Sequence, residues 1–206
     1  MAVARLPRVA NGVSLTGYSA LSALADLLTI ARNTGRLYET ALGKVLEVLN
    51  LKHGNIRIFN LATGELQLMS QCGFPDEYLE KYANIKLGER SSGKIVRTRG
   101  PVLWDNIQTD ASCAYLYLRK EGVNSLLGVP LLAREGVVGT LAVASLKRGR
   151  FQEQEIQLVA AMGRVIGIAI ENSRLFTALK SNVDDLTKLT LRLEESDGIK
   201  DRLLGV

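Results

Sequence analysis

Residues 152–197 have the pattern of one long helix whose surroundings change along its length. Only Gly163 and Gly167 weaken it before Gly198, and each glycine costs a helix up to ~1 kcal/mol relative to alanine. The first half is apolar on almost all sides, which is typical of a helix buried in its own domain. The second half is polar with one narrow apolar stripe. The fold must therefore accept a helix that starts in a core and protrudes from it.

The narrow stripe has the spacing of a coiled coil. Its members are separated alternately by four and three residues, over about three heptads. They are Asn172, Phe176, Leu179, Val183, Leu186, Thr190 and Leu193. Leu175 and Leu189 lie alongside and offer an alternative stripe. Because the other elements precede this segment, the stripe stays exposed unless it pairs. We predict a parallel homodimeric coiled coil, in which Asn172 and Thr190 fix the register.

Two amphipathic helices precede the strands. Apolar residues recur at steps of three and four over 19–32 and again over 37–50, the pattern of helices with one buried face. Residues 1–17 have weak periodicity, and we expect a flexible tail there. Alternation at period two over 55–60 and 66–69, on either side of a glycine-containing turn, predicts a β-hairpin.

Short helices and further strands complete the domain. The helices are predicted over 75–82, 92–99 and 110–121. The strands are predicted over 102–104, 124–133 and 136–146, the last two joined by a tight turn. Strands enclosed by helices from both ends of the chain predict an α+β sandwich.

Composition and charge narrow the class of protein. The 206 residues suit one large domain, or one domain with a helical extension. The net charge is 26 − 21 = +5, and the basic residues are spread along the chain, so we predict no nucleic-acid partner. No apolar run approaches the ~20 residues that cross a bilayer, and the first residues lack a signal-peptide core. We therefore expect a cytoplasmic chain with no membrane partner.

Five short segments, taken in order, resemble one family. They are GERSSGKIV at 88–96, GPVLWD at 100–105, SLLGVPL at 125–131, GVVGTLAV at 136–143, and Phe151 followed by acidic residues. Their order and spacing resemble the GAF domain, a sensor fold for small molecules, over roughly residues 20–175. The resemblance implies an antiparallel sheet with the terminal helices on one face. It also implies a pocket on the other face, covered by loops and short helices.

The end of the chain carries a second resemblance. Residues 199–206, IKDRLLGV, are similar to those just before the phospho-acceptor histidine box of sensor histidine kinases. This implies the N-terminal sensor domain of a bacterial two-component kinase, in a sequence that ends before the box and before the kinase core, its downstream partner. We expect no enzyme activity in this fragment. Its expected function is to bind a small ligand and pass a conformational signal through the paired helix.

These observations divide the chain into three parts. We expect a flexible N-terminal tail over 1–17, a GAF-like sensor domain over 18–175, and a signalling coiled-coil helix over 176–206.

The resemblance to the GAF domain also places the residues of a ligand pocket. By position in the family they are Trp104, Cys113, Tyr115, Tyr117, Leu127 and Val129. Aromatic side chains with few polar atoms suit a small, partly apolar ligand, whose identity the sequence leaves open. The alternative is that these side chains only pack the core, with the tyrosine hydroxyls reaching solvent.

Cys113 introduces two further alternatives. Bilin-binding relatives have a cysteine four residues before a tyrosine, as in Cys113 and Tyr117, but they place a histidine where this chain has Ala114. Other relatives reduce methionine sulfoxide with cysteines near the pocket, and Cys72 and Cys113 are the two cysteines here. A cysteine-dependent redox enzyme and a bilin photosensor using Cys113 therefore stand as alternatives to the non-catalytic sensor.

None of these motifs requires a cofactor. Cys72, Cys113 and His53 lie far apart in the sequence, so we predict no zinc site. His53 lies in a segment that we predict to be an exposed loop, which does not favour haem. Ala114 in the same way does not favour bilin.

Overall fold

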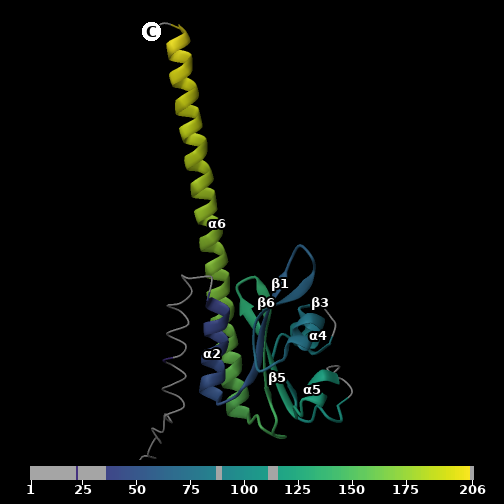
Figure 1. Ribbon diagram of the computed structural model, residues 1–206. Helices are drawn as coiled ribbons and strands as arrows, with labels where there is room; N and C mark the ends of the chain where they lie inside the picture. The colour runs from purple at the N-terminus through teal and green to yellow at the C-terminus, as the bar shows by residue number, and fades with distance from the viewer. Residues whose placement is uncertain (1–21, 23–35, 87–89, 111–115, 205–206) are drawn as a thin grey trace, which may run out of the picture.

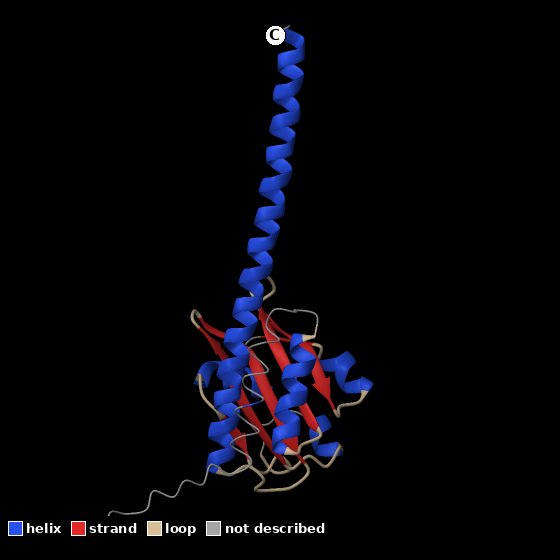
Figure 2. Cartoon of the chain, turned by 90° about the vertical axis from the view of Figure 1, so that its left-hand side faces the viewer, coloured by secondary structure: helices blue, strands red, loops and turns tan. Residues whose placement is uncertain are grey.

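The computed structural model describes residue 22 and residues 36–86, 90–110 and 116–204. The predicted tail over 1–17 lies outside these residues, as does nearly all of the predicted helix over 19–32. The described residues form one six-stranded sheet with helices on both faces (Figure 1, Figure 2). The predicted α+β class is confirmed.

All neighbouring strands in the sheet are antiparallel, and their order is β3-β2-β1-β6-β5-β4. The strands are β1 (His53–Asn60), β2 (Glu65–Cys72), β3 (Asn84–Lys86), β4 (Val102–Trp104), β5 (Ser125–Ala133) and β6 (Gly136–Ser145). The helices are α2 (Leu37–Leu49), α3 (Asp76–Tyr82), α4 (Arg90–Thr98), α5 (Leu116–Lys120) and α6 (Glu153–Leu204). The predicted hairpins correspond to β1–β2 and β5–β6.

The differences from the predicted elements lie in short segments. β3 was not predicted, because three residues are too few to show a period. The helix expected over 110–121 is described only as α5, and Asp110 closes a hydrogen-bonded turn from Asn106 instead. His53 does not lie in a loop, because it opens β1 and pairs with Ala144 of β6.

One core lies between the sheet and the two long helices, α2 and α6, which cover the same face (Figure 2). Successive side chains of a strand point to opposite faces, so every second residue of the central strands enters this core. From the sheet these are Ile56, Ile58, Leu127, Val129, Leu131, Leu141 and Val143. From α6 they are Val159, Met162, Ile166, Ala169 and Ile170, at the three- and four-residue steps of a buried helix face.

α6 comes close to β5 at two glycines. A Cβ on Gly163 would lie 2.9 Å from Val129 Cγ2, and a Cβ on Gly167 would collide with the backbone of Leu132. The two residues that weaken the helix by propensity are therefore the ones that let it lie directly on the strand.

Beyond the sheet, α6 continues as a single projecting helix (Figure 1). Its 52 residues span about 78 Å at 1.5 Å per residue. Ser173 is the last buried residue, and the described side chains after it are exposed. The predicted change from a buried to a protruding helix is confirmed. Among the described residues, no helix is both long enough and apolar enough to cross a membrane.

Candidate functional site

The sheet has a second covered face, away from α2 and α6, which we call the distal face. α3, α4 and α5 contribute to its cover (Figure 1). Its buried side chains form a core separate from the one beneath α6. They include Tyr78 and Tyr82 from α3, Ile95 from α4, Trp104 from β4 and Leu118 from α5. This is the face on which the sequence predicted a ligand pocket.

Among the predicted pocket residues whose side chains the structure describes, Trp104 lies on the distal face. Its side chain is buried, and Lys94 Nζ of α4 lies 5.4 Å from the centroid of its ring, within cation–π distance. A Cβ on Gly128 of β5 would collide with Ile95 and would also lie 3.7 Å from the Trp104 ring. The absence of a side chain at Gly128 therefore lets α4 seat Ile95 against the sheet beside Trp104.

Leu127 and Val129 do not share a site with Trp104. Both are buried in the core beneath α6, where Val129 faces Gly163. Leu126, which pairs with Trp104, is the β5 residue that enters the distal core. The prediction of one pocket is therefore wrong for Leu127 and Val129, because alternation along β5 turns them to the opposite face.

The other predicted pocket residues are described only in part. Cys113 and Tyr115 lie outside the described residues. Tyr117 lies in α5, where the structure describes the backbone. Their approach to Trp104 stays a prediction.

A row of aromatic rings covers part of the distal face. The ring centroids of Phe74 and Tyr78 are 4.7 Å apart, and those of Tyr78 and Tyr82 are 5.0 Å apart. His53 of β1 continues the row, 6.0 Å from Phe74. None of these rings was predicted from the sequence to belong to the site, although Tyr78 and Tyr82 stand four residues apart and so share a face of α3.

Arg57 lies in β1 at the centre of the sheet, with 0% of its surface exposed. Its Nη1 donates to the Ala83 carbonyl oxygen at 3.3 Å, and its Nη2 donates to the Tyr78 hydroxyl at 3.4 Å. Its Nε has no hydrogen-bond partner. Thr140 of β6 is the residue opposite Arg57, and its buried hydroxyl also has no partner. Two neighbouring strands thus carry unpartnered polar atoms on one buried face.

The period-two pattern of β1 concealed this arrangement. In Asn55-Ile56-Arg57-Ile58 polar and apolar residues alternate, which is the usual sign of a sheet with one face in water. In the structure the face that holds Arg57 lies beneath α3, and Asn55 on that face is buried as well. The signal that the sequence offered for this buried site was Arg57 itself, a charged residue within a predicted strand.

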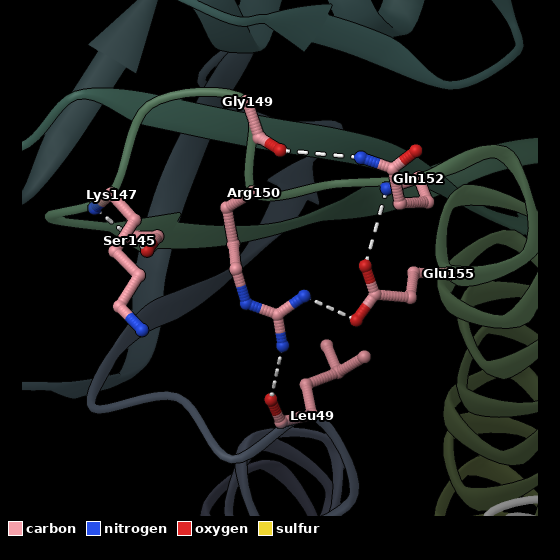
Figure 3. Close-up of polar contacts among 7 residues, drawn as sticks. All are labelled: Leu49, Ser145, Lys147, Gly149, Arg150, Gln152 and Glu155. Atoms are coloured by element: carbon pink, nitrogen blue, oxygen red, sulfur yellow. Dashed lines mark hydrogen bonds and ion pairs between the residues drawn. The ribbon is translucent and has the colours of Figure 1, made fainter.

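Polar contacts join the start of α6 to the end of α2 (Figure 3). Arg150 forms an ion pair with Glu155, and its Nη2 donates to the Leu49 carbonyl oxygen at 2.9 Å. The Glu155 carboxylate also accepts a hydrogen bond of 3.2 Å from the Gln152 backbone N–H, which caps the first turn of α6. Gln152 Nε2 donates to the Gly149 carbonyl oxygen at 3.3 Å. These contacts fix the two long helices to each other at the base of the domain.

The predicted dimer residues lie along the projecting part of α6. Phe176, Leu179, Val183, Leu186 and Leu193 are between 51% and 65% exposed. Asn172 and Thr190 are exposed as well, and so are Leu175 and Leu189 of the alternative stripe. Nothing in the described part of the chain covers this stripe, and its pairing with a second copy stays a prediction.

Cys72, the cysteine within the described residues, is exposed at the end of β2. It pairs with Gly54, and a Cβ on Gly54 would meet Leu42 and Leu46 of α2, so Cys72 faces the α2 side of the sheet. It lines a cavity of about 550 Å³ that also includes residues of α2 and α3. Across residues 36–86, 90–110 and 116–204 no three His, Cys, Asp or Glu side chains are placed to hold a metal ion.

Solved structures with the same fold come from several kinds of protein. The GAF domain of a phosphoenolpyruvate-protein phosphotransferase from Coxiella burnetii superposes with a TM-score of 0.67, at 18% identity over 80% of this chain and 99% of that one. Free methionine-R-sulfoxide reductase from Neisseria meningitidis, in complex with its substrate, has a TM-score of 0.63 at 14% identity, over 76% and 90%. A domain described as part of a two-component sensor histidine kinase from Sinorhizobium meliloti has a TM-score of 0.60 at 19% identity, over 71% and 96%.

At these identities the three structures establish the fold alone. The sequence itself matches the GAF domain family over residues 31–171, which span all the described strands and all the buried residues of α6 except Ser173. The chain therefore belongs to the GAF domain family, whose members are ligand-binding sensory domains.

Proposed function

We propose that this chain is the non-catalytic sensory domain of a cytoplasmic two-component sensor histidine kinase. It binds a small ligand on the distal face and passes the change to a kinase core through α6 in a homodimer. The observation that carries this proposal is the continuity of α6. One helix is buried against the sheet at its start and exposes an apolar stripe at its end.

β5 provides the mechanical link between the two faces. Its residues alternate between the distal core, which holds Leu126, and the core beneath α6, which holds Leu127 and Val129. α6 touches the same strand at Gly163 and Gly167 with no side chain between. A ligand that displaces β5 therefore displaces α6, because closely packed elements transmit shifts rather than absorb them. The ligand drives this change only through its different affinity for the two states.

A second copy of the chain is the partner that fits the exposed stripe. The four- and three-residue spacing continues from Asn172 to Leu193, which is the spacing that keeps a seam facing a parallel partner helix. The members of the stripe are aliphatic or aromatic apart from Asn172 and Thr190. A monomer would leave the apolar members in water.

The kinase context is supported by two separate observations. Residues 199–206 resemble the segment before a phospho-acceptor histidine box. The Sinorhizobium meliloti domain with the same fold is described as part of a sensor histidine kinase. The phosphotransferase and reductase domains share that fold, so the kinase assignment depends mainly on the C-terminal segment.

Native mass spectrometry tests the dimer and the ligand together. We expect the purified chain at twice 22.5 kDa, with additional non-covalent mass that is lost under denaturing conditions. Substituting Leu179→Glu and Leu186→Glu together should give a folded monomer, because both side chains lie in the seam. Leu191→Glu is the matched control, since Leu191 is also more than half exposed but lies off the stripe. A wild-type monomer would contradict the dimer mechanism.

A further inference from the structure

We propose that the distal face binds a small carboxylate through the Arg57 guanidinium and the Thr140 hydroxyl. This inference deepens the proposed function, because it depends on a ligand site and names the chemical class of the ligand. It is carried by two unpartnered polar groups on neighbouring strands, one of them a buried charge.

The Arg57 guanidinium has hydrogen-bond donors that no acceptor of the protein uses. A guanidinium carries five N–H donors and no acceptor. In Arg57 two of them are used, toward the Ala83 carbonyl oxygen and the Tyr78 hydroxyl, so three remain, including the Nε–H. Both acceptors are neutral. No ion pair of Arg57 occurs with any residue of the described chain, although the side chain is 0% exposed. A buried cation without an opposite charge is costly, and an anion would offset that cost.

Thr140 places a hydroxyl beside this cation. Arg57 and Thr140 are directly opposite in the antiparallel β1–β6 pair, so their side chains leave the sheet on the same face as neighbours. Thr140 is 1% exposed, and its Oγ1 has no partner. A hydroxyl both donates and accepts, so an oxygen atom held by Arg57 can also accept the Thr140 hydrogen. One oxyanion therefore satisfies both groups.

The geometry of the free donors favours a carboxylate. Nε–H and the adjacent Nη–H of a guanidinium form a planar fork that matches the two oxygens of a carboxylate. A phosphate carries more negative charge and would call for further cations. The surrounding side chains carry no charge: Tyr78, whose hydroxyl accepts from Arg57, and Ala142 and Asn55, which are paired on the same buried face. One charged group on an otherwise apolar body suits such surroundings.

A cavity of about 240 Å³ lies at the end of the same strand. It is lined by Phe59, two residues after Arg57 in β1, by Val96 and Arg99 of the α4 segment, and by Glu135, Gly136 and Val137 at the β5–β6 turn. This volume accommodates the body of a small metabolite.

Thermal unfolding with simple anions tests the inference. The probes are sodium acetate, disodium succinate and sodium phosphate, each compared with sodium chloride at equal ionic strength. At ten times its dissociation constant a ligand should raise the Tm of the wild-type chain by about 3–5 °C. We expect this rise with acetate or succinate and not with phosphate. A rise with phosphate alone would overturn the assignment to carboxylates.

Three variants separate binding from structural support. Arg57→Met keeps the length of the side chain and removes its charge, so the carboxylate response should disappear. Thr140→Val keeps the shape and removes the hydroxyl, so the response should fall at least twofold even if Arg57→Met does not fold. Arg148→Met removes an exposed arginine from the β6–α6 connection and should leave the response unchanged.

The Nε–H signal of Arg57 in a ¹H–¹⁵N spectrum gives an independent readout, because only a ligand at that atom moves it directly. Titration with acetate or succinate should shift this signal. If no probe moves the signal or the Tm, Arg57 is a structural support for α3 and the inference is wrong. A dimeric chain with that result still fits the proposed function, whereas a monomer that binds carboxylates contradicts only the dimer mechanism.

Discussion

Gly167 of α6 lies against the backbone of Leu132 of β5 so closely that any side chain at this position would collide with the strand. The contact joins α6, which projects from the domain, to β5, which contributes side chains to both cores. It lies just before the projecting stripe begins at Asn172. A movement of β5 therefore reaches the exposed part of α6 within about one and a half turns.

Substituting Gly167→Ala should destabilise the domain by about 1–3 kcal/mol, because the added methyl group forces α6 away from β5. Urea unfolding followed by circular dichroism measures the change. Gly43→Ala is the matched control, since Gly43 is an exposed glycine in α2 with no atom within 4 Å of its Cβ position. The control should gain about 0.5–1 kcal/mol through helix propensity. Equal effects at both sites would show that Gly167 has no packing role.

Removing Arg150 should weaken the junction between α2 and α6. Arg150→Ala removes the ion pair with Glu155 and the bond to the Leu49 carbonyl oxygen, and we expect a loss of about 1–2 kcal/mol. A double-mutant cycle with Glu155→Ala should give a coupling energy of at least ~0.5 kcal/mol. Lys188→Ala, which removes an exposed pair with Asp185, should change stability by less than about 0.5 kcal/mol. Additive effects at Arg150 and Glu155 would contradict this role.

Thr190→Leu should tighten the dimer, because an apolar residue replaces a polar one within the seam. Thr187→Leu is a closely matched control off the stripe. Both hydroxyls are exposed and donate to the carbonyl oxygen four residues before, at 3.0 Å for Thr190 and 2.8 Å for Thr187. Sedimentation equilibrium should give a dissociation constant at least tenfold lower for Thr190→Leu only. The same change in both variants would place the seam elsewhere on α6.

Cys113→Ser distinguishes the sensor from the redox alternative. For a non-catalytic sensor, we expect neither the wild-type chain nor the variant to reduce free methionine-R-sulfoxide, and both should stay folded and dimeric. Cys72→Ser is the control, because Cys72 is exposed on the α2 side of the sheet. Wild-type reductase activity that is lost in Cys113→Ser would favour the enzyme instead.

The spacing of apolar residues was enough to predict the elements that are long enough to show a period. The hairpin of β1 and β2, the β5–β6 pair, α2 and the change of character along α6 all follow from the spacing of apolar residues. The order of short motifs was enough to indicate the family, which the match over residues 31–171 then established. β3 was not predicted, because its three residues are defined as a strand only by their pairing with β2 in the folded chain.

Which residues make up the candidate site was decided by the tertiary structure. Alternation shows that Leu126 and Leu127 face opposite ways, but it does not say which of them meets Trp104, because that depends on which helices cover each face. The burial of Arg57 depends in the same way on α3, which is distant from β1 in sequence and returns to cover it. The sequence by itself therefore determined most of the elements, through local spacing, and the family, through the order of its motifs. Only the packing of distant segments decided which side chains share a buried face.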